Sequence, residues 1–201
     1  MNLPNKITLT RIFMIPVFIV FFYLTIMPFN YVVAAVVFAL AAFTDALDGH
    51  IARKYNLVTN LGKFLDPIAD KVLVSTAFIL LLTSPAAFML APFGWAGLVT
   101  AGICVSVILA RELIVSGFRM IAAGRNLVLA ADKLGKFKTT AQDVSIFLLL
   151  VSMSFLNYAF GEVFAYIGLV FFALCTVLTV VSGANYIIKN RHVLKETEGQ
   201  S

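Results

Sequence analysis

Charged side chains are scarce in this sequence: only 12% of its 201 residues are charged, whereas 61% are hydrophobic. This composition, with a mean hydropathy of +0.99, excludes an ordinary soluble domain and is typical of a membrane protein. Four long stretches contain no charge at all, and they cover residues 12–44, 72–110, 144–161 and 163–188. The first two are too long for one membrane span of about 20 residues, and proline-containing segments divide each of them.

The uncharged stretches therefore predict six transmembrane helices, at residues 10–27, 31–54, 63–83, 93–122, 136–157 and 162–189. No linker, low-complexity tract or convincing repeat separates them. We expect residues 1–201 to form a single domain of an all-α integral membrane protein, with a polar tail at about 192–201. The N-terminus lacks the charged start and cleavage site of a signal peptide, and its apolar run continues into a full span.

Cysteine is also rare, since Cys104 and Cys175 are the only two in the chain. Each lies alone in an apolar stretch without metal-site spacing, so we expect both to be small buried residues. The absence of nearby His or Cys clusters argues against a zinc site.

Basic residues are missing from the predicted loops near 28–30, 84–92 and 158–161, and all fifteen Lys and Arg lie toward the opposite helix ends. By the positive-inside rule that side is cytoplasmic, and both termini lie on it. The net charge of +5 is then an orientation signal and an attraction for anionic lipid headgroups. A nucleic-acid partner is not expected, because no soluble basic surface remains. These features predict a multi-pass protein of the cell (inner) membrane.

At the predicted cytoplasmic interface the sequence contains four aspartates. Asp45 and Asp48 are three residues apart, and Asp66 and Asp70 are four apart, so each pair shares one face of a helix. Two antiparallel neighbouring helices can bring all four carboxylates together, where they would repel or take up protons if left unpaired. One or two Mg²⁺ or Mn²⁺ ions resolve this, because hard oxygen ligands suit them. Such ions keep positions open for substrate phosphates, which predicts a phosphate ester or pyrophosphate substrate.

Small residues accompany the aspartates, and they allow two interpretations. Gly49, Ala52 and Gly62 would let a flat base or a phosphate approach the backbone, or they would serve tight helix packing. Arg53 would neutralise a phosphate or extend toward the lipid headgroups. Intramembrane carboxylates also form ion pathways, so a cation transporter is the alternative function. The uncharged outer halves of the predicted helices favour chemistry at the inner interface instead.

Together these residues spell D-x2-D-G-x2-A-R-x8-G-x3-D-x3-D, from Asp45 to Asp70. This pattern resembles the full signature of the CDP-alcohol phosphotransferases, with no departure in spacing. The similarity extends from the opening "NLPNKITLTR" to the last predicted helix. Within the family, the stretches "GKFLDPIADK", "ARELIVSGFR" and "GKFKTT" most resemble bacterial members that make phosphatidylglycerol phosphate.

The resemblance implies a reaction in which CDP-diacylglycerol and sn-glycerol 3-phosphate give phosphatidylglycerol phosphate and CMP. It assigns metal binding to Asp45, Asp48 and Asp66, and the role of general base and additional ligand to Asp70. It also implies a homodimer, and a CDP site formed by Asn5, Thr8, Gly49, Ala52, Arg53 and Gly62. Other members of the family would use serine, an inositol phosphate or phosphatidylglycerol as the acceptor.

A phosphorylated acceptor needs cations of its own. Arg111 and Arg119 are eight residues apart and thus nearly on one helical face, while Lys136 and Lys138 open the fifth predicted helix, whose N-terminus also favours anions. These four residues predict an acceptor-phosphate pocket; the alternative is that they only anchor helices at the interface, and the position of Arg111 after a long uncharged run favours the pocket. Glu112 could orient one of these cations, and Lys71 could pair with a site aspartate or meet headgroups.

Overall fold

The computed structural model describes the backbone of residues 3–27, 29–54, 60–88, 94–124 and 133–189. Side chains are described for residues 8–27, 29–44, 68–84, 86–88, 94–119 and 134–189.

The described residues form six α-helices and one short 3-10 helix, without any strand, which confirms the all-α prediction. The elements are α1 (Leu3–Tyr23), α2 (Asn30–Lys54), α3 (Asn60–Thr83), η1 (Pro85–Ala87), α4 (Gly94–Gly124), α5 (Lys133–Met153) and α6 (Ala159–Lys189). Each helix contains most of one predicted span, because long apolar runs are stable as helices in lipid, where even an internal proline such as Pro16 of α1 is tolerated.

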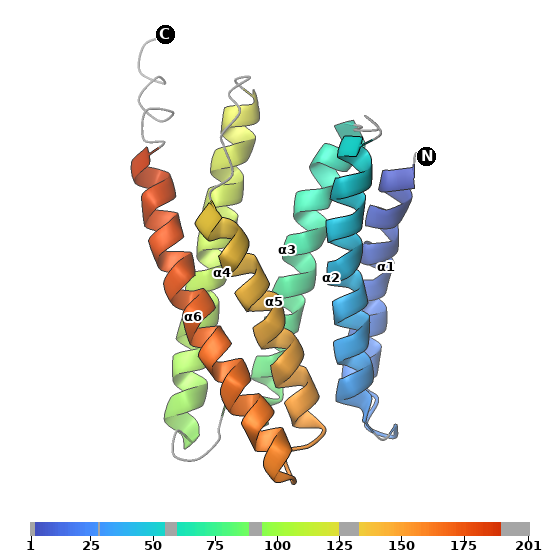
Figure 1. The fold of residues 1–201 in the computed structure, drawn as a ribbon, viewed down its shortest axis with the longest axis vertical. Coiled ribbons are helices and arrows are strands. Elements are labelled where there is room, and N and C mark those ends of the chain that lie inside the picture. Colours follow the sequence, from blue (N-terminus) through green and yellow to red (C-terminus); the bar gives the residue numbers. More distant parts are fainter. Residues whose placement is uncertain (1–2, 28, 55–59, 89–93, 125–132, 190–201) are drawn as a thin grey trace.

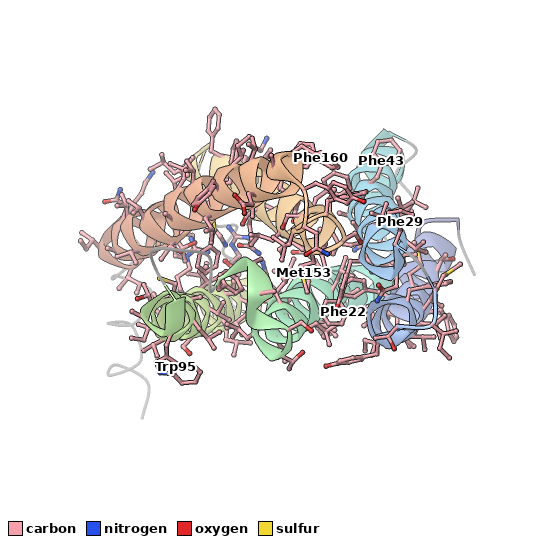
Figure 2. All side chains as sticks on the ribbon, turned by 90° about the horizontal axis from the view of Figure 1, so that it is seen from below. Phe22, Phe29, Phe43, Trp95, Met153 and Phe160 are labelled. Atoms are coloured by element: carbon pink, nitrogen blue, oxygen red, sulfur yellow. The ribbon has the colours of Figure 1, made fainter. Side chains whose placement is uncertain are left out.

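Successive helices alternate in direction (Figure 1). The starts of α1, α3 and α5 and the ends of α2, α4 and α6 therefore point toward the same end of the bundle, at the top of Figure 1. Viewed along the bundle, the helices form two layers, with α4, α3 and α1 in one and α6, α5 and α2 in the other (Figure 2). Across the layers α1 packs on α2, α3 on α5, and α4 on α6.

Two helices end four residues earlier than predicted. α1 ends at Tyr23, where the side-chain amide of Asn30 donates a hydrogen bond of 2.8 Å to the backbone carbonyl oxygen of Phe22. That bond satisfies a carbonyl of the last turn, and the left-handed backbone of Phe29 (φ 61°) reverses the chain just before α2. α5 ends at Met153, after which backbone hydrogen bonds form a turn that leads into α6. Hydropathy alone does not reveal these two helix ends, because most of the turn residues that follow them are themselves apolar.

Phenylalanine rings fill much of the space between the layers. Phe18 lies 6.0 Å from Phe38 across α1 and α2, and Phe172 of α6 contacts both Phe78 and Phe88 at ring-centre distances of 5.7 and 5.4 Å. All five side chains are buried. Phe18 and Phe172 are thus core residues and not part of the outer surface.

The outer surface is also apolar. Many large hydrophobic side chains point away from the bundle, among them Trp95 at the periphery of Figure 2 and Val170 on α6. Within the described residues, Gly94–Arg119 and Ala159–Lys189 are long and apolar enough to cross a membrane, and Thr8–Tyr23 and Asn30–Thr44 are shorter apolar segments. A bundle with an apolar core and an apolar exterior is suited to a lipid surrounding.

The contact between α5 and α6 depends on small residues. Gly161, Ala165 and Gly168 begin a buried stripe on α6, and the hydroxyl of Ser145 on α5 donates a hydrogen bond of 3.0 Å to the carbonyl oxygen of Gly168. Small residues at these positions let the two helices approach closely, which is how helices associate in membranes. At Gly161 the constraint is local, because a β-carbon there would overlap the backbone carbonyl of Phe155 in the turn that precedes α6.

We expect Gly161→Ala to lower the free energy of unfolding by about 1–3 kcal/mol, because the added methyl group meets backbone atoms that cannot move aside. Thermal unfolding of the detergent-solubilised protein measures this. Gly102→Ala is the matched control, since nothing lies within 4 Å of its added β-carbon. Equal unfolding temperatures for both variants would contradict the packing described here.

Candidate active site

The aspartate signature occupies the end of α2 and the beginning of α3. Residues 45–54 are helical, as predicted, whereas α3 begins at Asn60, three residues earlier than predicted. Both segments lie at the end of the bundle where α1 begins (Figure 1). The side chains of eight predicted site residues lie outside the described part of the chain; they are Asn5, Asp45, Asp48, Gly49, Ala52, Arg53, Gly62 and Asp66. The described side chains alone contain no group of three potential metal ligands, so the convergence of four carboxylates stays a prediction.

The last aspartate of the signature is described, and it lies next to a cation. The ammonium nitrogen of Lys71 is 3.3 Å from Oδ2 of Asp70, and both side chains are partly exposed. Of the two roles considered for Lys71, the structure shows the ion pair with an aspartate. Both members of this ion pair therefore belong to α3.

Lys71 also joins a larger group of charges around Glu112 of α4. The buried carboxylate of Glu112 contacts Lys71 through Oε2, and through Oε1 it contacts Lys138 of α5 and the Nη1 atom of Arg111, the latter at 3.0 Å. Three helices thus supply cations to one carboxylate. We call Asp70, Lys71, Arg111, Glu112 and Lys138 the Glu112 cluster.

Among the described residues, the Glu112 cluster contains three basic and two acidic side chains. Lys138 is only 2% exposed, and a buried ammonium is stable only beside a counterion, which Glu112 provides. Arg and Lys side chains together are the usual ligands of a phosphate, so the basic side chains of the cluster are candidates for binding one.

The guanidinium of Arg111 also contacts α6. Its Nη2 atom donates a hydrogen bond of 3.0 Å to the hydroxyl of Ser182, while its aliphatic stem lies against Gly183. Neither α6 residue was identified from the sequence. The available signal was a Ser-Gly pair within an otherwise apolar helix, and that signal alone does not distinguish a polar contact from helix packing.

The other two predicted acceptor-site cations lie elsewhere. The guanidinium carbon of Arg119 is 5.6 Å from the ring centre of Tyr186, and Lys136 is exposed without an ion pair to any described residue. α5 begins at Lys133, three residues earlier than predicted, so Lys136 and Lys138 do not open the helix. The hydroxyl of Thr139 donates to the carbonyl oxygen of Gly135 within the same helix.

On α1, Thr8 and Arg11 are both buried and lie one turn apart. Thr8 was predicted to contribute to the CDP site, whereas Arg11 was counted only in the pattern of basic residues. An arginine is seldom buried without a partner, and both residues interact with other groups of the protein. Burial, which the sequence pattern does not reveal, sets Arg11 apart from the exposed Lys and Arg side chains.

Comparison with known proteins agrees with the signature. The sequence model of the CDP-alcohol phosphatidyltransferase family matches residues 1–181. A Bacillus subtilis protein named CDP-diacylglycerol--glycerol-3-phosphate 3-phosphatidyltransferase is 40% identical, over 96% of this chain and 97% of its own length. Proteins of the same name from Rickettsia bellii and Salmonella typhimurium are 37% and 36% identical, over 92% of this chain and 93% of theirs. The chain belongs to the CDP-alcohol phosphatidyltransferase family.

Proposed function

We propose that this protein transfers the phosphatidyl group of CDP-diacylglycerol to sn-glycerol 3-phosphate, which gives phosphatidylglycerol phosphate and CMP. The observation that carries the proposal is a chain of ion pairs that links Asp70 through Lys71 and Glu112 to Arg111 and Lys138. This chain places a carboxylate that can accept a proton beside cations that can bind an anion. An acceptor that bears both a hydroxyl and a phosphate can use the carboxylate and the cations together, whereas serine has no phosphate. The names of the relatives designate the same two substrates.

We propose that Asp45, Asp48, Asp66 and Asp70 hold two Mg²⁺ or Mn²⁺ ions. Carboxylate oxygens are the donors that these ions prefer, and the family generally depends on a divalent metal. When bound, the ions would neutralise charge on the pyrophosphate and stabilise CMP as the leaving group. The CDP group would be held by Asn5, Thr8, Gly49, Ala52, Arg53 and Gly62.

The residues of the Glu112 cluster would divide the remaining work. Arg111, Lys138 and Lys71 hold the phosphate of the acceptor, which places its free hydroxyl near Asp70. The hydroxyl oxygen attacks the phosphorus that bears diacylglycerol, the bond from that phosphorus to the CMP oxygen breaks, and Asp70 accepts the hydroxyl proton. Phosphoryl transfer of this kind depends mainly on positioning and on charge stabilisation. Arg119 and Lys136 would add to the positive field that attracts the acceptor.

The same proposal includes the placement in the membrane. The chain would be a single domain that crosses the cell membrane six times, with both termini and the active site on the cytoplasmic side. The acyl chains of CDP-diacylglycerol then remain in lipid, while the cytidine and the soluble acceptor enter from water. As its resemblance implies, the protein would act as a homodimer.

Acceptor-dependent release of CMP tests the reaction. We expect the purified protein with CDP-diacylglycerol to release CMP only when sn-glycerol 3-phosphate and Mg²⁺ or Mn²⁺ are present, and excess chelator to stop the release. Serine, an inositol phosphate and phosphatidylglycerol serve as competing acceptors in parallel reactions. Preferential use of any of these would replace the proposed acceptor, and cation flux in proteoliposomes without CMP release would favour a transporter.

Asp70→Asn is expected to lower kcat by about 10²–10⁴-fold, because an amide of the same shape cannot accept the hydroxyl proton. Binding of CDP-diacylglycerol, measured directly on the same preparation, should persist. Full turnover in this variant would refute the role of general base.

Arg111→Ala is expected to raise the KM for sn-glycerol 3-phosphate roughly ten- to a hundredfold, because a charged hydrogen-bond donor to the acceptor is lost. The KM for CDP-diacylglycerol should change much less. Lys189→Ala, which removes an exposed positive charge at the end of α6, is the matched control. Equal changes in both KM values would contradict the assignment of Arg111 to the acceptor.

A further inference from the structure

Two residues of α6, Ser182 and Gly183, lie directly against Arg111 and have no role in the reaction described so far. We propose that they are positioning residues, which fix the guanidinium of Arg111 for the phosphate of the acceptor and thereby set the selectivity for a phosphorylated acceptor. The inference rests on the proposed function, because it gives Arg111 the task of binding that phosphate.

Two hydrogen bonds fix the orientation of the Ser182 hydroxyl. It donates to the carbonyl oxygen of Thr179 at 3.3 Å, so its lone pairs are left to accept the hydrogen bond from Nη2 of Arg111 at 3.0 Å. Ser182 is almost completely buried, so bulk water does not compete strongly for this oxygen. A hydroxyl in this state is a fixed acceptor for a cation.

Arg111 is therefore held at both of its terminal nitrogens. Nη1 donates to Glu112 on α4, and Nη2 donates to Ser182 on α6, each at 3.0 Å. A planar guanidinium with two such partners cannot rotate freely about its last bonds. Its orientation is thus determined jointly by two helices before any acceptor arrives, which lowers the entropy cost of binding.

Gly183 provides the space that this orientation requires. A β-carbon at this position would lie 2.9 Å from Cγ of Arg111 and 3.3 Å from Nε. Because Cγ is close to the α4 backbone, it cannot yield without a different side-chain rotamer, and that rotamer would carry the guanidinium away from Ser182. Arg119 likewise meets α6, over the ring of Tyr186, so the end of α6 contacts both arginines of α4.

Helix packing is the alternative role for Ser182 and Gly183, and the chain offers matched controls for it. Ser145→Ala removes another buried interhelical hydrogen bond of 3.0 Å, and Gly168→Ala places a β-carbon 3.0 Å from Leu149. Both controls disturb the packing of α6 without touching Arg111. A role in packing alone would make the test variants and the controls behave alike.

The experiment measures KM for each substrate, kcat and thermal unfolding for Ser182→Ala, Gly183→Ala and the two controls. We expect both test variants to raise the KM for sn-glycerol 3-phosphate roughly tenfold with little change in the KM for CDP-diacylglycerol. Ser182→Thr, which keeps the hydroxyl, should restore most of the affinity. The controls should lower the unfolding temperature without a selective change in KM.

A second comparison isolates the coupling to Arg111. In the Arg111→Ala background, Ser182→Ala should produce no further rise in the KM for sn-glycerol 3-phosphate, because the contact is already absent. Independent, multiplicative effects would overturn the inference, as would equal KM changes in Ser145→Ala and Gly168→Ala. If the unmodified protein releases CMP with sn-glycerol 3-phosphate, these outcomes leave the proposed function standing. If it does not, the proposed function fails and this inference fails with it.

Discussion

The arrangement of the candidate site depends on the neutralisation of buried positive charge by Glu112. One carboxylate on α4 contacts Lys71 of α3, Arg111 of α4 and Lys138 of α5. Loss of one partner from a buried ion pair is strongly destabilising, by about 3–5 kcal/mol, because a charge is left uncompensated. Glu112 therefore determines where these cations lie and ties α3, which carries the end of the aspartate signature, to the second half of the chain.

Much of the fold follows from the sequence because lipid permits few backbone structures. Long uncharged runs correspond to helices, although Pro16 lies inside α1. The early helix ends at Tyr23 and Met153 arise from local hydrogen bonds within apolar turns. The ion pair of Asp70 and Lys71 does not follow from the sequence, because consecutive side chains of a helix do not usually face each other.

The contacts between distant segments could not be predicted in the same way. Glu112 and Lys138 are 26 residues apart in sequence, and only the packing of the helices brings them together. Arg119 shares a helical face with Arg111, yet spacing does not reveal that Tyr186 of α6 meets it there. Ser182 and Gly183 were overlooked for a similar reason, because small residues in an apolar helix usually signify close packing.

Asp70 and Lys71 are adjacent in a regular helix, and this adjacency couples the positions of their two functional groups. Their backbone separation is set by a single peptide unit of about 3.8 Å between α-carbons. Under the proposed function, one side chain serves the attacking hydroxyl and the other belongs to the group that holds the phosphate. One helix then carries both groups, so any shift of α3 would move the proton acceptor and this phosphate-binding cation together.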